Sequence, residues 1–333
     1  GFDDLAAMVA DYTPERVAEI CDIDARDLSA AAELYAKASR APIVYCLGVV
    51  EHSTGTEGVM ALSNLALVSG KLGKPGCGIN PLRGQNNVQG ACDMGAGPAD
   101  FTGYQKVANP DARAKFEAAW GVTFNQTPGQ KATECFPAMI DGRIRGLFLF
   151  GEDPVRTDPD TGHVIRALES LDFFVCEELF MTETAKYADV ILPGRSYAEK
   201  EGTFTNTERR VQRVRKAVDG PAGARLDTEV FADIMRRMGY DQPTLTGAQL
   251  MDEVASLTPS YAGISHARLD SAAVAGQGLQ WPCTGPDHPG TRILHEGAFS
   301  RGMGGYSLAQ YRPSAEQPDE EFPLVMMTGR VLA

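Results

Sequence analysis

The stretch from Ile144 to Pro154, Ile-Arg-Gly-Leu-Phe-Leu-Phe-Gly-Glu-Asp-Pro, decides the fold class of this chain. Its apolar run has the length of a buried strand, and a turn of Gly, Glu, Asp and Pro follows it. A helical pattern then covers 163–168, a second apolar strand covers 173–176, and a short helix at 182–186 precedes a third strand at 190–192. This alternation predicts an α/β, Rossmann-like domain with a parallel sheet, whose ligands lie beyond the carboxyl ends of the strands.

A similar pattern occupies the first part of the chain. Thr13 followed by Pro14 predicts one helix start, and Asp24 predicts another. Residues 42–47 form an unbroken apolar run typical of a buried parallel strand, and residues 54–69 carry apolar side chains at helical spacing. These elements predict a second α/β domain.

The pattern becomes irregular after the third strand. Residues 202–204 and the basic stretch 209–216, in which valines alternate with arginines, predict a β-ribbon. The basic side chains could neutralise phosphates or form a solvated strand face. Asp227 is expected to open another helix as its N-cap, with Gly239 closing it. From about residue 276 the chain is rich in Gly and Pro, which predicts an irregular connection.

The composition excludes several classes of partner. The 333 residues include 31 basic and 44 acidic side chains, a net charge of −13. Nucleic acids and anionic membrane surfaces both require a cationic face, so we expect neither as a partner. No apolar run approaches the roughly 20 residues that span a bilayer, and the chain starts with acidic residues where a signal peptide is basic. We therefore expect a cytoplasmic protein.

The metal-binding residue types are scattered. Seven cysteines and five histidines occur, and none forms a Cys-x-x-Cys group. Iron–sulfur and zinc sites depend on such closely spaced ligands. The sequence therefore predicts no metal site built from these side chains alone, and we assign no metal ligand to this chain.

The run Asn80–Gly95 shows neither a helical nor a strand period. It contains one cation, Arg83, among carboxamides and glycines. Glycines allow the backbone to approach a ligand closely, and a fixed guanidinium surrounded by neutral polar groups suits a small anion. The alternative is a solvated surface loop, although the apolar residues between Val88 and Met94 indicate partial burial.

This run resembles a segment of the catalytic subunits of molybdenum- or tungsten-dependent formate dehydrogenases, within the molybdopterin oxidoreductase family. Further motifs extend the resemblance over most of the chain, namely 70–76, 151–154, 188–193, 199–206 and 322–330. The resemblance implies the Rossmann-like parallel-sheet domains of the molybdopterin oxidoreductase fold, with an irregular β-containing linker region. It also implies that the chain is the central part of a longer subunit.

The resemblance divides the chain into four expected segments. These are part of a first α/β pterin-binding domain (1–84), part of a second α/β dinucleotide-binding domain (85–197), a region of ribbon, helix and irregular connection (198–315), and the start of a truncated C-terminal β domain (316–333).

The same resemblance implies the chemistry. Formate would be oxidised to CO2 at a molybdenum, or tungsten, held by two molybdopterin guanine dinucleotides. A [4Fe-4S] cluster is expected in the missing amino-terminal part, together with the cysteine or selenocysteine that ligates the metal. Electrons would pass to other formate dehydrogenase subunits that carry iron–sulfur clusters and flavin, and from these to NAD.

Individual positions match functional positions of the family. Arg83 matches the arginine that orients the formate carboxylate, and the alternative is a surface arginine. The positions expected to contact the cofactor are Gly48, Glu51, His52, Gln85, Asn86, Gly151, Glu152, Asp153, Thr157, Glu177, Ser196 and Asp227. Asp153 would pair with the guanine edge, although turn chemistry also explains it. Glu177 and Glu51 stand where relatives usually carry glutamine.

Two rival functions remain open. One is another bis-pterin oxidoreductase such as nitrate reductase, and the run from Arg83 to Gly95 argues against it. The other is a non-catalytic scaffold such as the pterin-free homologue in respiratory complex I, against which Arg83, Gln85 and Asp153 argue. An independent dinucleotide-binding enzyme is disfavoured because no Gly-x-Gly-x-x-Gly turn follows either first strand.

Overall fold

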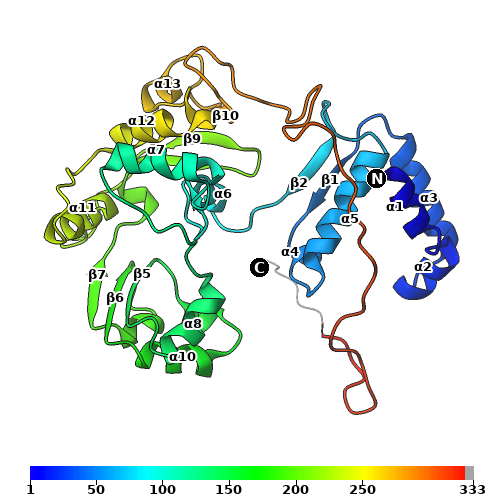
Figure 1. Cartoon of the computed structure of the whole chain (residues 1–333), viewed down its shortest axis with the longest axis horizontal. Helices are drawn as coiled ribbons and strands as arrows, with labels where there is room; N and C mark the ends of the chain where they lie inside the picture. Colours follow the sequence, from blue (N-terminus) through cyan, green and yellow to red (C-terminus); the bar gives the residue numbers. More distant parts are fainter. Residues whose placement is uncertain (327–333) are drawn as a thin grey trace. The chain divides into compact units, whose positions relative to one another are not determined.

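The structure is a computed structural model that describes residues 1–326, and it contains two compact units (Figure 1). The first unit is Gly1–Gly84 together with the chain from Arg292, and the second unit is Gln85–Thr291. Within the described residues, no helix is both long enough and apolar enough to cross a membrane. The four-segment division expected from the family remains a prediction about the longer protein.

The first unit begins with helices whose starts follow from their capping residues. Thr13 Oγ1 accepts a hydrogen bond from the backbone N–H of Arg16 at 3.3 Å, and Asp24 Oδ1 accepts one from the N–H of Arg26 at 2.8 Å. Because these bonds satisfy orphan donors, they confirm both predicted helix starts. The helices of this unit are α1 (Phe2–Val9), α2 (Pro14–Cys21), α3 (Ala25–Lys37), α4 (Leu47–Val50) and α5 (Gly55–Val68).

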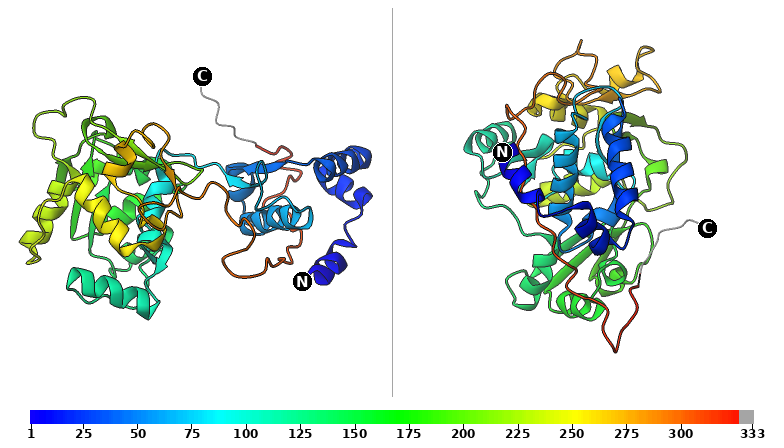
Figure 2. Two further views of the ribbon diagram at one scale, coloured as in Figure 1. Left: turned by 90° about the horizontal axis from the view of Figure 1, so that it is seen from above. Right: turned by 90° about the vertical axis from the view of Figure 1, so that its right-hand side faces the viewer.

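Two parallel strands complete the first unit. The predicted strand is confirmed as β1 (Pro42–Tyr45), which pairs with β2 (Gly78–Pro81). The chain from Arg292 to Met326 runs past these elements without regular helix or strand (Figure 2). It is attached where Asn64 of α5 exchanges two hydrogen bonds with the backbone of Ser307, at 2.7 and 3.0 Å. The strand expected over 323–327 is absent from residues 323–326, and residue 327 and the rest of that motif lie outside the described residues.

The second unit contains the predicted series of strands and helices. Strands β5 (Gly146–Phe150), β6 (Phe173–Glu178) and β7 (Val190–Pro193) form a parallel sheet in this order. The connecting helices are α9 (Pro154–Thr157), α10 (Thr161–Glu169) and the single 3-10 turn η2 (Thr184–Tyr187). Helix α8 (Ala132–Ile140) packs beside α10 (Figure 1). The core consists of Val155, Val164, Leu168, Phe174, Cys176 and Ala185.

The predicted ribbon is confirmed as β8 (Gly202–Thr205) and β9 (Arg210–Val214). A third strand, β10 (Leu279–Gln280), pairs with β9, so the first part of the tail expected to be irregular belongs to this sheet. Helices α11 (Asp227–Arg237), α12 (Gly247–Leu257) and α13 (His266–Asp270) follow the ribbon in the chain. A second core forms here from Val211, Met251, Tyr261, Ile264, Leu269, Leu279 and Cys283.

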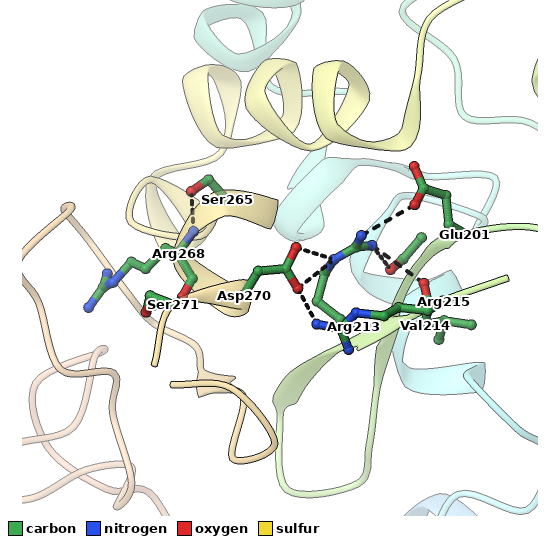
Figure 3. Close-up of polar contacts among 9 residues, drawn as sticks. Glu201, Arg213, Val214, Arg215, Ser265, Arg268, Asp270 and Ser271 are labelled. Carbon is green, nitrogen blue, oxygen red and sulfur yellow. Dashed lines mark hydrogen bonds and ion pairs between the residues drawn. The ribbon is translucent and has the colours of Figure 1, made fainter. Parts of the chain in front are cut away.

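Arg213 of β9 and Arg215, which follows this strand, both form ion pairs within the second unit (Figure 3). The side chain of Arg213 is only 9% exposed, and its Nε donates to both carboxylate oxygens of Asp270 at 3.2 Å. Arg215 pairs with the same carboxylate. On the other side of the Arg213 guanidinium, Nη2 lies 3.4 Å from Glu201 Oε2. A buried guanidinium must be paired, and the partners of Arg213 are carboxylates of this chain. Arg213 therefore belongs neither to a phosphate site nor to a solvated strand face.

The sequence predicts no helix or strand in the run Asn80–Gly95, but the structure shows both. Its first two residues end β2, and its second half forms helix α6 (Val88–Asp93). Asn87 precedes this helix with a φ of 58°, in the left-handed region that asparagine tolerates. The helix is too short for its periodicity to be visible in the sequence. The remaining elements are β3 (Asp100–Phe101), η1 (Thr102–Tyr104), β4 (Gln105–Lys106) and α7 (Pro110–Trp120).

Candidate functional site

In the first unit, the candidate residues follow directly on the carboxyl ends of the parallel strands. The N–H of Leu82 donates to the carbonyl of Tyr45 at 2.8 Å, which fixes the start of the loop that carries Arg83 beside the end of β1. Arg83 itself is exposed. In open parallel sheets this edge is where ligands bind. A guanidinium there can reach an anion, as its assigned role requires.

The other three candidates of the first unit follow β1. Gly48 lies inside the short helix α4 rather than in a simple turn, and Glu51 and His52 come directly after that helix. All three are exposed. The His52 ring Nε2 lies 3.0 Å from the carbonyl oxygen of Gly48, so this bond joins the two ends of the segment. The arrangement suits a backbone-lined contact surface.

Gln85 and Asn86 open the second unit and are exposed. The next residue, Asn87, was not among the predicted site residues, yet it anchors this loop. Its Oδ1 accepts the N–H of Thr205 in the ribbon at 2.9 Å. A Cβ at Gly90 would lie 2.1 Å from the same Oδ1, so only glycine leaves room for this side chain. The asparagine followed by glycine three residues later was the available sequence signal.

Asp93, at the end of α6, is a second residue that sequence reasoning missed. It is fully buried, and its Oδ1 accepts hydrogen bonds from Gln89 Nε2 at 2.8 Å and the Tyr104 hydroxyl at 2.7 Å. Its Oδ2 accepts from the Tyr261 hydroxyl at 2.5 Å and Trp281 Nε1 at 2.8 Å. Burial, with the Asp93 charge and hydrogen bonds, raises the pKa of both tyrosines. The carboxylate thus holds α6 against three distant parts of the second unit.

Asp153 and Thr157 lie beyond the carboxyl end of β5, as expected. Asp153 Oδ1 accepts the N–H of Thr184 at 3.0 Å and its hydroxyl at 2.6 Å. Thr157 donates from its N–H and hydroxyl to the Asp153 carbonyl at 3.1 and 3.2 Å. Burial opposes ionisation of Asp153, but the hydrogen bonds from Thr184 and the charge of Arg156 lower its pKa. The turn chemistry is therefore present, and a nucleotide contact would be additional to it.

Asp153→Ala in the intact protein is expected to lower the free energy of unfolding by about 1–3 kcal/mol at neutral pH, because the buried donors of Thr184 lose their acceptor. The pKa of Asp153 is lower in the folded protein than its unfolded value of 3.8. Ionised Asp153 therefore stabilises the fold above pH 3.8, and this stabilisation is lost as the pH falls through the folded-state pKa. Urea unfolding at neutral and acidic pH measures this effect. The exposed Asp141→Ala is the control, and equal destabilisation by both would contradict the assignment.

Candidates from all three strands of the second sheet meet at one edge. The N–H of Gly151, after β5, donates to the Glu177 carbonyl at 3.0 Å, and the N–H of Gly194, after β7, donates to the Glu178 carbonyl at 3.1 Å. The strand ends are therefore level with one another. Glu152, next to Gly151, is exposed at this edge.

Ser196 and Asp227 both lie at the start of a helical segment. Ser196 begins the 3-10 turn η3 (Tyr197–Glu199), and its N–H donates to Glu199 Oε2 at 2.9 Å. Asp227 is the first residue of α11, and the N-cap position belongs to Leu226, so the expected capping role of Asp227 is wrong. Its carboxylate instead forms an ion pair with Lys200. A capping side chain must precede the first helical residue, which Asp227 does not.

Glu177 is the most unusual of the predicted residues. It is 1% exposed, and neither carboxylate oxygen has a hydrogen-bond partner among the described residues. Burial, reinforced by the charge of Asp227, raises its pKa to about 7. Orphaned buried oxygens require an explanation, and a ligand or a bound proton supplies one. This feature fits a site that binds a polar group such as a nucleotide.

A cavity of about 600 Å³ in the second unit adjoins Asp227 and Lys200. Its lining also includes Tyr197, Phe204 and His266. His266 is buried, and this burial lowers its pKa, which favours the neutral ring. Sequence reasoning missed Lys200 and His266, because single charged residues give no signal without their neighbours. Among residues 1–326 there is no group of three His, Cys, Asp or Glu side chains that could hold a metal ion.

Comparison with known proteins agrees with these features. The family model for molybdopterin oxidoreductase matches residues 24–237. The chain is 45% identical to the F420-dependent formate dehydrogenase 2 subunit alpha of Methanococcus maripaludis, covering 100% of this chain and 49% of that protein. It is 37% identical to formate dehydrogenase H of Escherichia coli, covering 99% of this chain and 46% of that protein. The chain thus spans about half the length of the curated relatives it matches.

A solved structure supports the fold. Acetylene hydratase from Pelobacter acetylenicus superimposes with a TM-score of 0.58 over 80% of this chain and 39% of that chain, at 20% sequence identity. Such low identity is informative about the fold alone. Together with the match over residues 24–237, it supports the predicted α/β fold class with parallel sheets. This chain belongs to the molybdopterin oxidoreductase family.

Proposed function

We propose that this chain is the central part of the catalytic subunit of a formate dehydrogenase. The observation that carries the proposal is its similarity, at 37–45% identity over nearly its whole length, to proteins named as formate dehydrogenases. Arg83 adds a physical reason, because it is exposed at the ligand edge of the first sheet. Its planar guanidinium can hold both oxygens of the formate carboxylate and so fix the direction of the C–H bond.

The cofactor in this proposal is a molybdenum or tungsten centre with two molybdopterin guanine dinucleotides, and when bound it supplies the two-electron chemistry. The chain's own residues bind and orient it. Gly48, Glu51 and His52 would face one dinucleotide, and Asp153, Thr157 and Asp227 the other. The cavity beside Asp227 and Lys200 supports a ligand at the second sheet.

The proposal also includes partners. A [4Fe-4S] cluster outside this chain would accept the electrons, and subunits with iron–sulfur clusters and flavin would carry them onward in the cytoplasm. NAD is the acceptor that the family resemblance implies. The matched relatives from Methanococcus maripaludis and Methanocaldococcus jannaschii are named as F420-dependent, so coenzyme F420 must be tested beside NAD.

The full-length protein tests the proposal. The purified protein should contain molybdenum or tungsten, iron and a guanine nucleotide, and should reduce a viologen dye with formate. Reduction of NAD or F420 by the whole complex then identifies the acceptor. Absence of metal and nucleotide would favour the scaffold function, and nitrate reduction without formate oxidation would favour the nitrate reductase type.

A further inference from the structure

Glu177 and Asp227 present two carboxyl groups to one small region of the second unit. A Cβ on Gly194 would lie 3.7 Å from Glu177 Oε1 and 4.0 Å from Asp227 Oδ1, so both groups flank the same point. The charged groups that act on Glu177 from the elements around it are Asp227, Lys200 and Arg225. Two anions this close repel each other, and one proton between them removes the repulsion.

The partners of the two acids decide which one keeps the proton. Asp227 forms an ion pair with Lys200, whose side chain is 29% exposed, and this contact favours the charged form of Asp227. Glu177 is 1% exposed and has no hydrogen-bond partner for either oxygen among the described residues. An ionised Glu177 would only accept hydrogen bonds and would find no donor, whereas a protonated Glu177 can donate one. The proton therefore belongs on Glu177.

We propose that Glu177 is a positioning residue whose protonated form donates a hydrogen bond to Asp227 and so fixes that carboxylate for the guanine nucleotide of the cofactor. This inference rests on the cofactor-binding part of the proposed function. Asp227 borders the 600 Å³ cavity, and its side chain is 19% exposed, so it can touch a ligand while Glu177 acts through it. The ionised form of Glu177 would instead compete with Asp227 for Lys200 and release the carboxylate.

Retention of guanine nucleotide tests this inference. Purified full-length holoenzyme is incubated at about pH 6 and about pH 8.5, below and above the titration of Glu177, and the nucleotide still bound is released with acid and quantified. The wild type should lose guanine nucleotide about tenfold faster at the higher pH. This factor corresponds to the free energy of one hydrogen bond to a charged group. Glu177→Gln keeps a neutral donor, so its loss should be slow at both values. Glu177→Ala should lose nucleotide quickly at both.

Two further measurements separate the possible outcomes. Glu183→Gln removes a charge from an exposed carboxylate that is paired with Lys186, and it should keep the wild-type pH dependence. Infrared difference spectra between Glu177→Gln and wild type at about pH 6 should show a protonated carboxyl group in the wild type alone, whether or not cofactor is present. Equal retention by the wild type at both pH values, or no such carboxyl signal, would overturn the inference. Bound nucleotide without formate oxidation would refute the proposed function and leave the inference standing.

Discussion

Replacing Arg83 with alanine in the full-length protein is expected to lower kcat/KM for formate by well over tenfold. A charge-assisted hydrogen bond to a carboxylate contributes about 1.5–3 kcal/mol, which corresponds to a loss of about 10- to 150-fold. The metal content should stay near normal, because Arg83 is exposed and lies beyond the end of β2 rather than in a core. Steady-state kinetics with a dye acceptor and elemental analysis measure both quantities.

Two variants serve as controls for this experiment. Arg83→Lys keeps the charge but loses the planar fork, so its kcat/KM should fall between those of the wild type and the alanine variant. Arg143→Ala removes an exposed arginine that is paired with Asp141, and its kinetics should match the wild type. Unchanged kinetics in Arg83→Ala with normal metal content would remove the role assigned to Arg83.

Asp93→Ala is expected to lower the free energy of unfolding by about 3–5 kcal/mol. The side chain is fully buried and accepts four hydrogen bonds, from Gln89, Tyr104, Tyr261 and Trp281. Its removal deletes four hydrogen bonds and opens a cavity, and both effects cost free energy. Gln89 Nε2 keeps its bond to the Tyr104 hydroxyl, and the Tyr261 hydroxyl keeps its contact with Thr205 Oγ1. Urea unfolding followed by tryptophan fluorescence is a suitable measurement, because Trp281 is one of the donors.

Matched variants test whether the Asp93 effect comes from hydrogen bonding. Asp219→Ala removes an aspartate whose side chain is 92% exposed, and it should change the free energy of unfolding by less than about 0.5 kcal/mol. Tyr104→Phe removes one of the four donors to Asp93, together with an acceptor of Gln89 Nε2, and should cost about 1 kcal/mol. If Asp93→Ala were as stable as Asp219→Ala, the carboxylate could not be what holds α6 in place.

The predictions that succeeded depended on short-range signals. Thr13 and Asp24 cap the helices they were expected to cap, and the apolar run from Gly146 to Phe150 is a strand. Some predictions failed because the element is too short to show a pattern, whereas the N-cap at Asp227 and the strand expected over 323–327, absent from residues 323–326, failed despite clear local patterns. Helix α6 has six residues, and β10 has two, so neither offers enough positions for a period to appear.

The candidate site likewise contains residues that local patterns indicated and residues that only the fold revealed. The family resemblance indicated Asp153 and Glu177 as candidate cofactor contacts, and the parallel strands place both at the carboxyl edge of the second sheet. The motifs contain Asn87 and Lys200 but did not indicate their roles. Each acts through a partner distant in the chain: Asn87 binds Thr205, and Lys200 binds Asp227. Such pairs are invisible until the chain folds.

The sequence by itself determined the strands β1, β5, β6 and β7, the helix starts at Thr13 and Asp24, and the family, because each of these is written in neighbouring residues through apolar spacing, capping or an ordered motif. The tertiary structure alone decided which polar groups share a buried environment. Asp93 meets Tyr261 across 168 residues, and Glu177 has Asp227 beside it but no donor. Charge states and hydrogen bonds depend on the distances between such groups and on the removal of water, and only packing sets these.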